Sequence, residues 1–228
     1  ELNKVTTVTN RNTGTFGVQG VTLTAGNNVT FRNNVISNVT QDMSGGVAFS
    51  TTFGTVGLRV AGGTGHKIYH NSVNMFGALL GTATASNLTA AFAIVGTGQT
   101  GIDVRNNIFA NTMTGGTTSI AHVPVVLPSS GTSAMNLTWN NNAYYTGSTA
   151  GVHGIAHVGT TYTAVPAGPA TYAGLYTAAN FAPGSTAGTT NFRSYTSTLL
   201  TANTNNDNAS FGTALAAPFT TPTDLHIN

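Results

Sequence analysis

Acidic side chains are scarce in this chain, and their positions limit the chemistry that it could carry out. The carboxylates number five, at Glu1, Asp42, Asp103, Asp207 and Asp224. Glycoside hydrolysis needs a pair of carboxyl groups within roughly 10 Å of each other, and calcium-assisted sites need several carboxylate oxygens. No two of these carboxylates occupy equivalent positions in the sequence repeat of this chain. The sequence therefore assigns no catalytic residue.

The histidines form no metal-binding pattern either. His153 and His157 are four residues apart, a spacing that suits a metal ion bound on a helix. Gly151, Gly154 and Gly159 disfavour a helix at this place, because glycine lowers helix stability. The remaining histidines are isolated in the sequence: His66, His70, His122 and His226. We therefore expect neither a metal site nor a cofactor.

The elements that would position any functional side chain are copies of one six-residue motif. It occurs at Phe31–Ile36, Ile68–Val73, Val104–Phe109 and Trp139–Tyr144, at spacings of 37, 36 and 35 residues. Each copy reads apolar, any residue, Asn or His, Asn, small or aliphatic, apolar. A fixed period of this length is the signature of a solenoid.

Around each motif, apolar and polar residues alternate. In the first copy this alternation covers Val21–Leu23 and Val29–Phe31, with a Gly/Asn break between the two runs. Alternation with period 2 predicts a strand, and such a break predicts a corner. Each repeat thus reads as strand, turn, strand, Asn pair and third strand. The sequence predicts an all-β fold, a right-handed parallel β-helix with coils of about 36 residues.

The prediction extends to loops and domains. Polar loops at residues 40–55, 77–90 and 113–120 are expected to protrude from one corner of the solenoid. We interpret 1–228 as a single β-helix domain, with an incomplete first coil at 1–20, regular coils over 21–146, and irregular coils and long loops over 147–228. A short helical piece is expected near residues 173–180. Because the chain starts at Glu1 and ends on a strand pattern, we expect it to be a segment of a longer polypeptide.

Stacking of the coils would align equivalent residues in columns. One inward column is expected to contain Phe31, Ile68, Val104 and Trp139, and its neighbour Val29, His66, Ile102 and Leu137. A single coil cannot bury its apolar face, so burial must come from the coils above and below.

The Asn column consists of Asn34, Asn71, Asn107 and Asn142. Asparagine tolerates the left-handed conformation that a sharp corner requires. Its amide can also form a hydrogen-bonded ladder with the same amide in the neighbouring coils. We favour this structural role over the alternative that these amides coordinate a ligand.

One outward column is the candidate binding site: Arg32, Tyr69, Arg105 and Asn140, each one residue after the inward apolar residue. Asp103 is expected to lie on the same face as Arg105. Stacked Arg and Tyr side chains could bind a sugar chain that runs along the solenoid. The alternative is a solvated face on which long side chains cover the strand backbone.

Three segments resemble the coils of secreted right-handed β-helix repeat proteins of the pectate-lyase-like superfamily, with the large surface proteins of Bacteroidetes-type bacteria most similar. They are Gly65–Met75, Val104–Asn111 and Leu137–Tyr145, and the closing Thr223–Ile227 is also similar. The resemblance implies an extracellular, cell-surface location. It specifies no single activity, because that superfamily includes lyases, hydrolases, adhesins and structural segments.

We therefore expect a non-enzymatic, extracellular structural or adhesive segment of a large bacterial surface protein or filament. The alternative is a polysaccharide lyase or hydrolase, or a carbohydrate-binding β-helix. Expected partners are flanking domains of the same polypeptide, surface glycans or identical subunits. The charged residues are only 5% of the chain and do not cluster, so no nucleic-acid partner is expected. No apolar run is long enough for membrane insertion.

Overall fold

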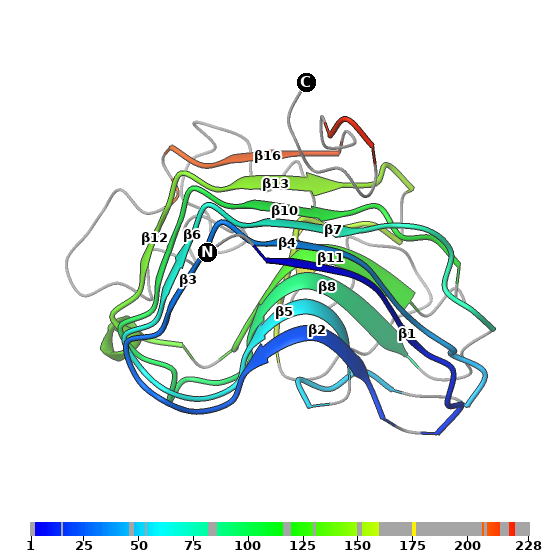
Figure 1. Ribbon diagram of the computed structural model, residues 1–228, viewed down its shortest axis with the longest axis horizontal. Coiled ribbons are helices and arrows are strands. Elements are labelled where there is room, and N and C mark those ends of the chain that lie inside the picture. The colour runs from blue at the N-terminus through cyan, green and yellow to red at the C-terminus, as the bar shows by residue number, and fades with distance from the viewer. Residues whose placement is uncertain are drawn as a thin grey trace.

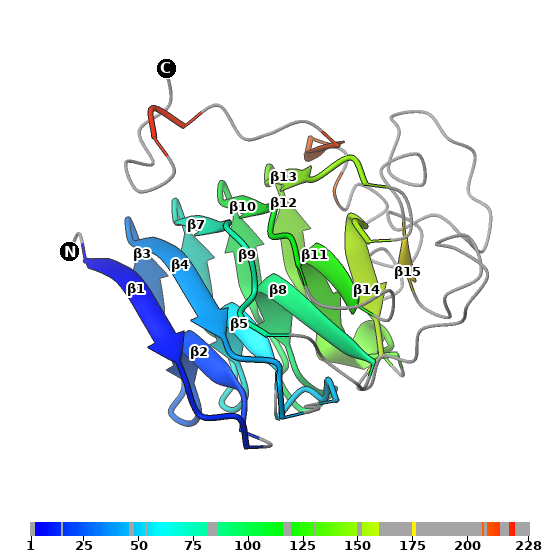
Figure 2. The ribbon, with the colours of Figure 1, turned by 90° about the vertical axis from the view of Figure 1, so that its right-hand side faces the viewer.

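The computed structural model is a parallel β-helix of about four turns with coils of about 35 residues, which confirms the predicted fold class. It describes residues 3–14, 16–45, 48–52, 54–81, 86–115, 120–129, 131–149, 152–159, 175–176, 207, 209–214 and 219–221. Figure 1 looks along the stack of coils, and Figure 2 shows the coils following one another from the N-terminal end.

Three sheets form the walls of the solenoid. Sheet A contains β1 (Lys4–Asn10), β4 (Val35–Gln41), β7 (Ser72–Met75), β10 (Ile108–Asn111), β13 (Ala143–Thr146) and β16 (Phe211–Thr213). Sheet B contains β2 (Val18–Leu23), β5 (Thr55–Val60), β8 (Asn87–Ile94), β11 (Ile120–Leu127), β14 (Ala156–Val158) and the antiparallel β15 (Leu175–Tyr176). Sheet C contains the three-residue strands β3 (Thr30–Arg32), β6 (Lys67–Tyr69), β9 (Asp103–Arg105) and β12 (Thr138–Asn140).

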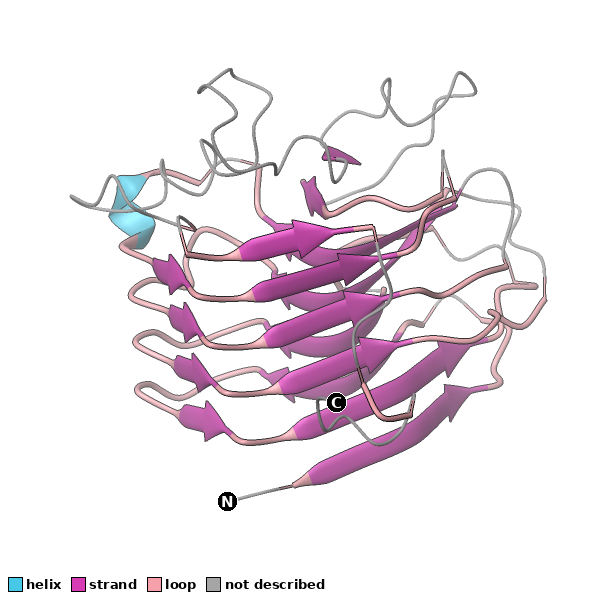
Figure 3. Ribbon diagram, turned by 90° about the horizontal axis from the view of Figure 1, so that it is seen from above, coloured by secondary structure: helices cyan, strands magenta, loops and turns pink. Residues whose placement is uncertain are grey.

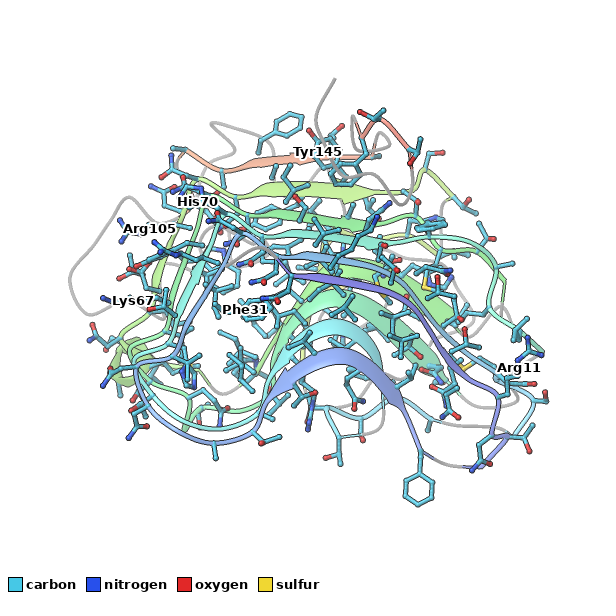
Figure 4. The ribbon with its side chains drawn as sticks, in the orientation of Figure 1. Arg11, Phe31, Lys67, His70, Arg105 and Tyr145 are labelled. Carbon is cyan, nitrogen blue, oxygen red and sulfur yellow. The ribbon has the colours of Figure 1, made fainter. Side chains whose placement is uncertain are left out.

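Each complete coil runs from sheet B through sheet C to sheet A, and the coils pair in the predicted register. Phe31 pairs with Ile68, Ile68 with Val104, and Val104 with Trp139. The last three side chains are buried, whereas Phe31 is only half-buried because β3 is the edge strand of sheet C. Figure 4 shows Phe31 inside the coil, with Lys67 and Arg105 outside it.

The short strands of sheet C are bracketed by left-handed residues at both ends. The residues before them are Asn28, Gly65, Gly101 and Asn136, with φ between 48° and 67°. The residues after them are Asn33, His70, Asn106 and Asn141, with φ between 55° and 59°. Asn, Gly and, less often, His tolerate this conformation. The two corners of each coil are therefore set by residue type.

This geometry corrects the sequence interpretation of the Asn column. We expected the left-handed corner at Asn34, Asn71, Asn107 and Asn142, but it lies one residue earlier in every coil. The motif thus divides two roles between adjacent positions. The first position turns the backbone, and the second carries the side chain that faces the neighbouring coils.

Sheet B arches toward sheet A, as Figure 1 shows for β2, β5, β8 and β11. A column of small or ring-constrained residues lies at the bend: Gly20, Gly57, Ala91 and Pro124. A Cβ atom on Gly57 would lie 2.4 Å from Cγ1 of Val73 and 2.7 Å from the carbonyl oxygen of Ala91. The absence of a side chain at Gly57 therefore lets the bend approach sheet A.

The central strands of sheet B are buried on both faces. Their inner face joins the main core, and their outer face forms a second apolar cluster: Phe49, Val56, Leu88, Ala90, Ala93, Ala121, Val123 and Val126. A strand buried on both faces loses the alternation that marks a half-exposed strand. Residues 87–90 show no such alternation, and for this reason we expected them in a loop. The structure places them in β8.

The other loop expectations were partly right. The described parts of the three expected loops lie at the corner between sheets A and B, but β4 continues to Gln41 and β5 begins at Thr55. The helical piece expected near residues 173–180 is wrong at Leu175–Tyr176, which form β15, and its other residues lie outside the described part of the chain. Figure 3 shows a 3-10 turn, η1 (Ser133–Met135), beside the last strand of sheet C.

We predict that Gly57→Ala lowers the free energy of unfolding by about 1–3 kcal/mol, because the added methyl group overpacks the bend of sheet B. Thermal or urea unfolding measures the effect. The matched control is Gly98→Ala, since a Cβ atom there meets nothing within 4 Å. Equal stability of the two variants would show that sheet B is not pressed against sheet A.

Candidate functional site

The second Asn of the motif forms a side-chain ladder through the stack. Nδ2 of Asn34 donates to Oδ1 of Asn71, Nδ2 of Asn71 to Oδ1 of Asn107, and Nδ2 of Asn107 to Oδ1 of Asn142, each at 3.0 Å. The backbone N–H of each donor residue reaches the same oxygen at 3.0–3.1 Å. Every Oδ1 of the last three rungs thus accepts two hydrogen bonds from the coil before it.

The ladder amides also hold the strands of sheet C. Nδ2 of Asn71 donates to the carbonyl oxygen of Phe31 at 3.0 Å, and Nδ2 of Asn107 donates to that of Ile68 at 2.9 Å. Nδ2 of Asn142 reaches the carbonyl oxygen of Val104 at 2.9 Å. All four ladder residues are buried. Their amide groups are therefore engaged in stacking rather than presented to a ligand.

Two further residues extend the ladder, and sequence reasoning missed both. Nδ2 of Asn3 donates to Oδ1 of Asn34 at 3.0 Å, and the backbone N–H of Asn142 donates to Oγ of Ser210 at 2.9 Å. Asn3 and Ser210 precede β1 and β16 directly, as Asn34 precedes β4. That adjacency was the available signal, but neither residue fits the period of the motif.

The outward column is assembled as expected on the outer face of sheet C. Arg32, Tyr69, Arg105 and Asn140 are register partners in β3, β6, β9 and β12. The guanidinium carbon of Arg105 lies 5.4 Å from the centre of the Tyr69 ring, within cation–π range. Figure 4 shows both Arg105 and Lys67 on the outside of the solenoid.

Asp103 organises this face. Arg105 donates from Nε to Oδ1 and from Nη2 to Oδ2 of Asp103, both at 2.7 Å, and the Tyr69 hydroxyl donates to the same carboxylate. Burial and the Asp103 hydrogen bond raise the pKa of Tyr69. The hydrogen bonds that Arg105 donates to Asp103 are also the main cause that raises the pKa of Arg105. The cluster is an internally paired unit on a solvent-exposed face.

The other described carboxylates have partners of their own. Asp42 accepts from the backbone N–H of Ser44 at 2.9 Å and from its hydroxyl, and these hydrogen bonds lower the pKa of Asp42. Asp207 is buried and accepts from the Tyr144 hydroxyl at 2.9 Å. The Trp139 indole N–H in turn donates to Tyr144. Asp42, Asp103 and Asp207 thus accept from different partners in different parts of the fold, and this arrangement gives no support for paired-carboxylate chemistry.

Tyr144 and Asp207 form the polar end of the core. Burial, followed by the charge of Asp207, raises the pKa of Tyr144 well above its usual value. The tyrosine therefore remains a neutral donor to the carboxylate. This contact could not be predicted from the sequence, because 62 residues separate the two positions and most of them carry no repeat.

A buried polar network connects sheets A and B. Nδ2 of Asn111 donates to Oγ1 of Thr89 at 2.9 Å and to the carbonyl oxygen of Val123 at 3.0 Å. Oγ1 of Thr89 lies 2.8 Å from Nδ1 of His122. Because Thr89 already accepts from Asn111, its hydroxyl hydrogen is available for the His122 ring. This arrangement fits a neutral His122.

His153 packs against this network. Its ring centre is 5.5 Å from that of His122; Nδ1 accepts from the N–H of Thr149 at 3.2 Å, and Nε2 lies 2.9 Å from the carbonyl oxygen of Met113. Burial, and secondarily the charge of His153, lower the pKa of His122 from 6.5 to about 3. His157, in contrast, packs against Phe49 of the outer cluster. The pair spaced by four in the sequence is therefore split between different environments.

Within the described ranges, no group of three or more His, Asp or Glu side chains is placed to hold a metal ion. The same part of the chain has no helix of the length and hydropathy that a membrane span requires.

Comparison of the chain with protein-family models, with curated proteins and with solved structures gives no match. The parallel β-helix is established by the structure, whereas these comparisons give no support to the superfamily resemblance of the coil motifs. The basis for a functional proposal is therefore the geometry of the ladder and of sheet C.

We predict that Asn107→Leu lowers the free energy of unfolding by about 3 kcal/mol or more. The substitution leaves the buried N–H and Nδ2 donors of Asn71 without their acceptor, and each unpaired group costs about 1–3 kcal/mol. Thermal unfolding checks this value. The neighbouring Asn106→Gly is the control, because Asn106 is exposed and glycine keeps its left-handed conformation. Unchanged stability of Asn107→Leu would refute the ladder.

We also predict that the fold loses stability as the pH falls from about 6.5 toward 3. The pKa of His122 is lowered in the folded protein, so its stabilising contribution is complete above 6.5 and is lost as the unfolded chain takes up the proton first. Urea unfolding across this pH range should show a smaller loss in His122→Gln. The control is His70→Asn, which removes an imidazole outside this network and carries the residue found at that corner in the other three motif coils.

Proposed function

We propose that this chain is a non-enzymatic structural or adhesive segment that acts outside the cell, as part of a bacterial surface protein or filament. The observation that carries the proposal is the use of the repeated motif. In every coil its left-handed residue turns the backbone and its asparagine joins the neighbouring coils. The motif that recurs in every coil thus serves assembly of the stack.

The chemistry of the side chains supports the same role. Arg105 is the basic residue on which the enzyme interpretation depends most. It donates hydrogen bonds to both carboxylate oxygens of Asp103. Asp42 and Asp207 accept hydrogen bonds from other residues, in other parts of the fold. A surface rich in Thr, Asn and Gly, with few charges, suits an extracellular stalk whose strength comes from stacking.

A carbohydrate-binding face is the second candidate, and the outer face of sheet C favours it. Tyr69 supplies an aromatic ring, and Arg32 and Lys67 supply cations beside it in the same two rows of side chains. In the described residues these two cations form no ion pair. A glycan lying along the solenoid axis would contact one residue of each row in every coil, so this face is compatible with an adhesive function.

The test is incubation of the purified chain with a panel of acidic and neutral polysaccharides, followed by assays for unsaturated and reducing ends. We expect none to form, because the described carboxylates are not paired for cleavage. Binding of a glycan without cleavage, weakened about tenfold by Tyr69→Ala, would support the adhesive form of the proposal. Arg11→Ala is the matched control, since Figure 4 places Arg11 on the opposite side of the solenoid.

Cleavage that disappears in Arg105→Ala and persists in Arg11→Ala would overturn the structural proposal and establish a polysaccharide-degrading enzyme. Cleavage unaffected by Arg105→Ala would overturn it as well, and would place the active site away from sheet C.

A further inference from the structure

Of the left-handed residues that bracket the strands of sheet C, His70 is the one that can take up a proton near neutral pH. It lies between β6 and β7 with φ of 55°, at the place that Asn33, Asn106 and Asn141 take in the other coils. Its side chain is exposed. Histidine is the side chain that changes charge between pH 5 and 8. The corner column therefore carries a titratable group in the coil of β6.

His70 adjoins the aromatic residue of the outward column. The centre of its ring lies 6.5 Å from that of Tyr69, edge to face. Tyr69 is the register partner of Arg32 in β3 and of Arg105 in β9, and Lys67 lies two residues before it on the same face of β6. Basic side chains thus stand on both sides of Tyr69, along the strand and along the solenoid axis. Figure 4 shows Lys67 and Arg105 outside this wall and His70 at the end of the wall toward sheet A.

The charges that surround His70 are mostly positive. The charged and titratable side chains of the adjoining sheet C strands are Arg32 of β3, Lys67 and Tyr69 of β6, and Asp103 and Arg105 of β9, whereas β4, β7 and β10 carry none. Burial raises the pKa of Tyr69, so its hydroxyl stays neutral near pH 7. Both oxygens of Asp103 already accept from Arg105. A protonated His70 therefore adds charge to a surface that is already net positive, and such a surface favours an anionic ligand.

We propose that the outer face of sheet C binds an anionic glycan, and that protonation of His70 strengthens this binding. The glycan contacts Tyr69, and its negatively charged substituents contact Lys67 and His70 on the two sides of that ring. Both statements rest on the carbohydrate-binding face that is the second candidate function above. They add the charge of the ligand and the control of its binding by pH.

The direction of the pH effect follows from linkage between proton and ligand. A ligand that binds the protonated form more tightly gains affinity as the pH falls from about 8 toward 5, and its binding takes up a proton. A single added charge close to an anion in water should strengthen binding roughly fivefold. The effect should weaken at high salt, because the face is exposed to solvent.

The probe is dextran sulfate, with unsulfated dextran as the matched neutral control. Sulfate esters keep their charge throughout the range in which histidine titrates, so a change of affinity with pH must come from the protein. Titration calorimetry with the whole chain, at about pH 5.5 and about pH 7.5, measures the affinity. We expect dextran sulfate to bind roughly fivefold more tightly at the lower pH, and dextran to bind more weakly than dextran sulfate at both.

His70→Asn is the decisive variant, because it removes the imidazole and carries the residue that the other coils have at this corner. It should abolish the difference in dextran sulfate affinity between the two pH values. Asn106→His places a second imidazole at the equivalent corner of the next coil and should enlarge that difference. Titrations in two buffers of different ionisation enthalpy should show proton uptake by the wild type and none by His70→Asn. Circular dichroism checks that each variant keeps the fold at both pH values.

Lys67→Ala separates the fixed charge from the titratable one. It should weaken dextran sulfate binding roughly fivefold at both pH values and leave the pH dependence in place. Arg11→Ala removes one cation as well, from the opposite side of the solenoid, and should leave the affinity unchanged. Equal losses in these two variants would mean that dextran sulfate responds only to net charge, which would overturn the site.

The remaining outcomes distinguish the two statements from the face on which they rest. Equal affinity of dextran sulfate at the two pH values, or a pH dependence that persists in His70→Asn, would overturn the control by His70. Equal binding of dextran and dextran sulfate would overturn the anionic ligand. In either case the carbohydrate-binding face stands if Tyr69→Ala weakens glycan binding. Absence of dextran sulfate binding would overturn both statements, and the face itself fails if no glycan of the panel binds.

Discussion

The structure depends on one constraint: a chain that turns sharply on both sides of a three-residue strand must satisfy the backbone groups that the turns leave behind. Left-handed residues at each end of the sheet C strands make the turns. The asparagine after the second turn satisfies the freed groups, because its amide reaches both the next rung and the carbonyl of the preceding coil. One residue thus turns the backbone, and the residue after it forms hydrogen bonds with the groups that the turn leaves unpaired.

The ladder also explains how the coils can differ elsewhere. The asparagine rungs fix the register of sheets A and C. The loops between sheets A and B can therefore differ in length and sequence from coil to coil. Sheet B is free to arch, provided that Gly20, Gly57 and Ala91 stay small at its bend. The arch brings Phe92 of β8 onto Phe109 of β10, with ring centres 4.8 Å apart. Core packing between the sheets follows from a bend made of small residues.

The functional proposals depend on which polar groups are already paired within the protein. Inside the stack, Asn34, Asn71 and Asn107 use their amides on the neighbouring coils, and outside it Arg105 and Tyr69 converge on Asp103. These groups are committed to the protein itself. Arg32 and Lys67 lie on the outer face of sheet C outside this cluster and form no ion pair in the described residues, which is why the glycan face is proposed there.

The sequence by itself determined the architecture, because a stacked fold repeats each environment once per coil and therefore writes it as a periodic pattern. The strand pairing, the inward column through Trp139 and the outward column through Arg105 were all readable from the spacing of one motif. The left-handed residue was assigned one position too late, since Asn occupies both places in most copies and composition cannot separate a backbone role from a side-chain role.

Tertiary structure alone decided the features that the repeated motif does not encode. The sequence of β8, which is buried on both faces, shows no alternation, and the contact of Asp207 with Tyr144 joins a position outside the repeat to the last residue of the fourth motif copy. The His122 network likewise depends on Thr89 and Asn111 arriving from two different sheets. Such contacts depend on which distant segments meet in the folded chain, and the period of the sequence does not encode them.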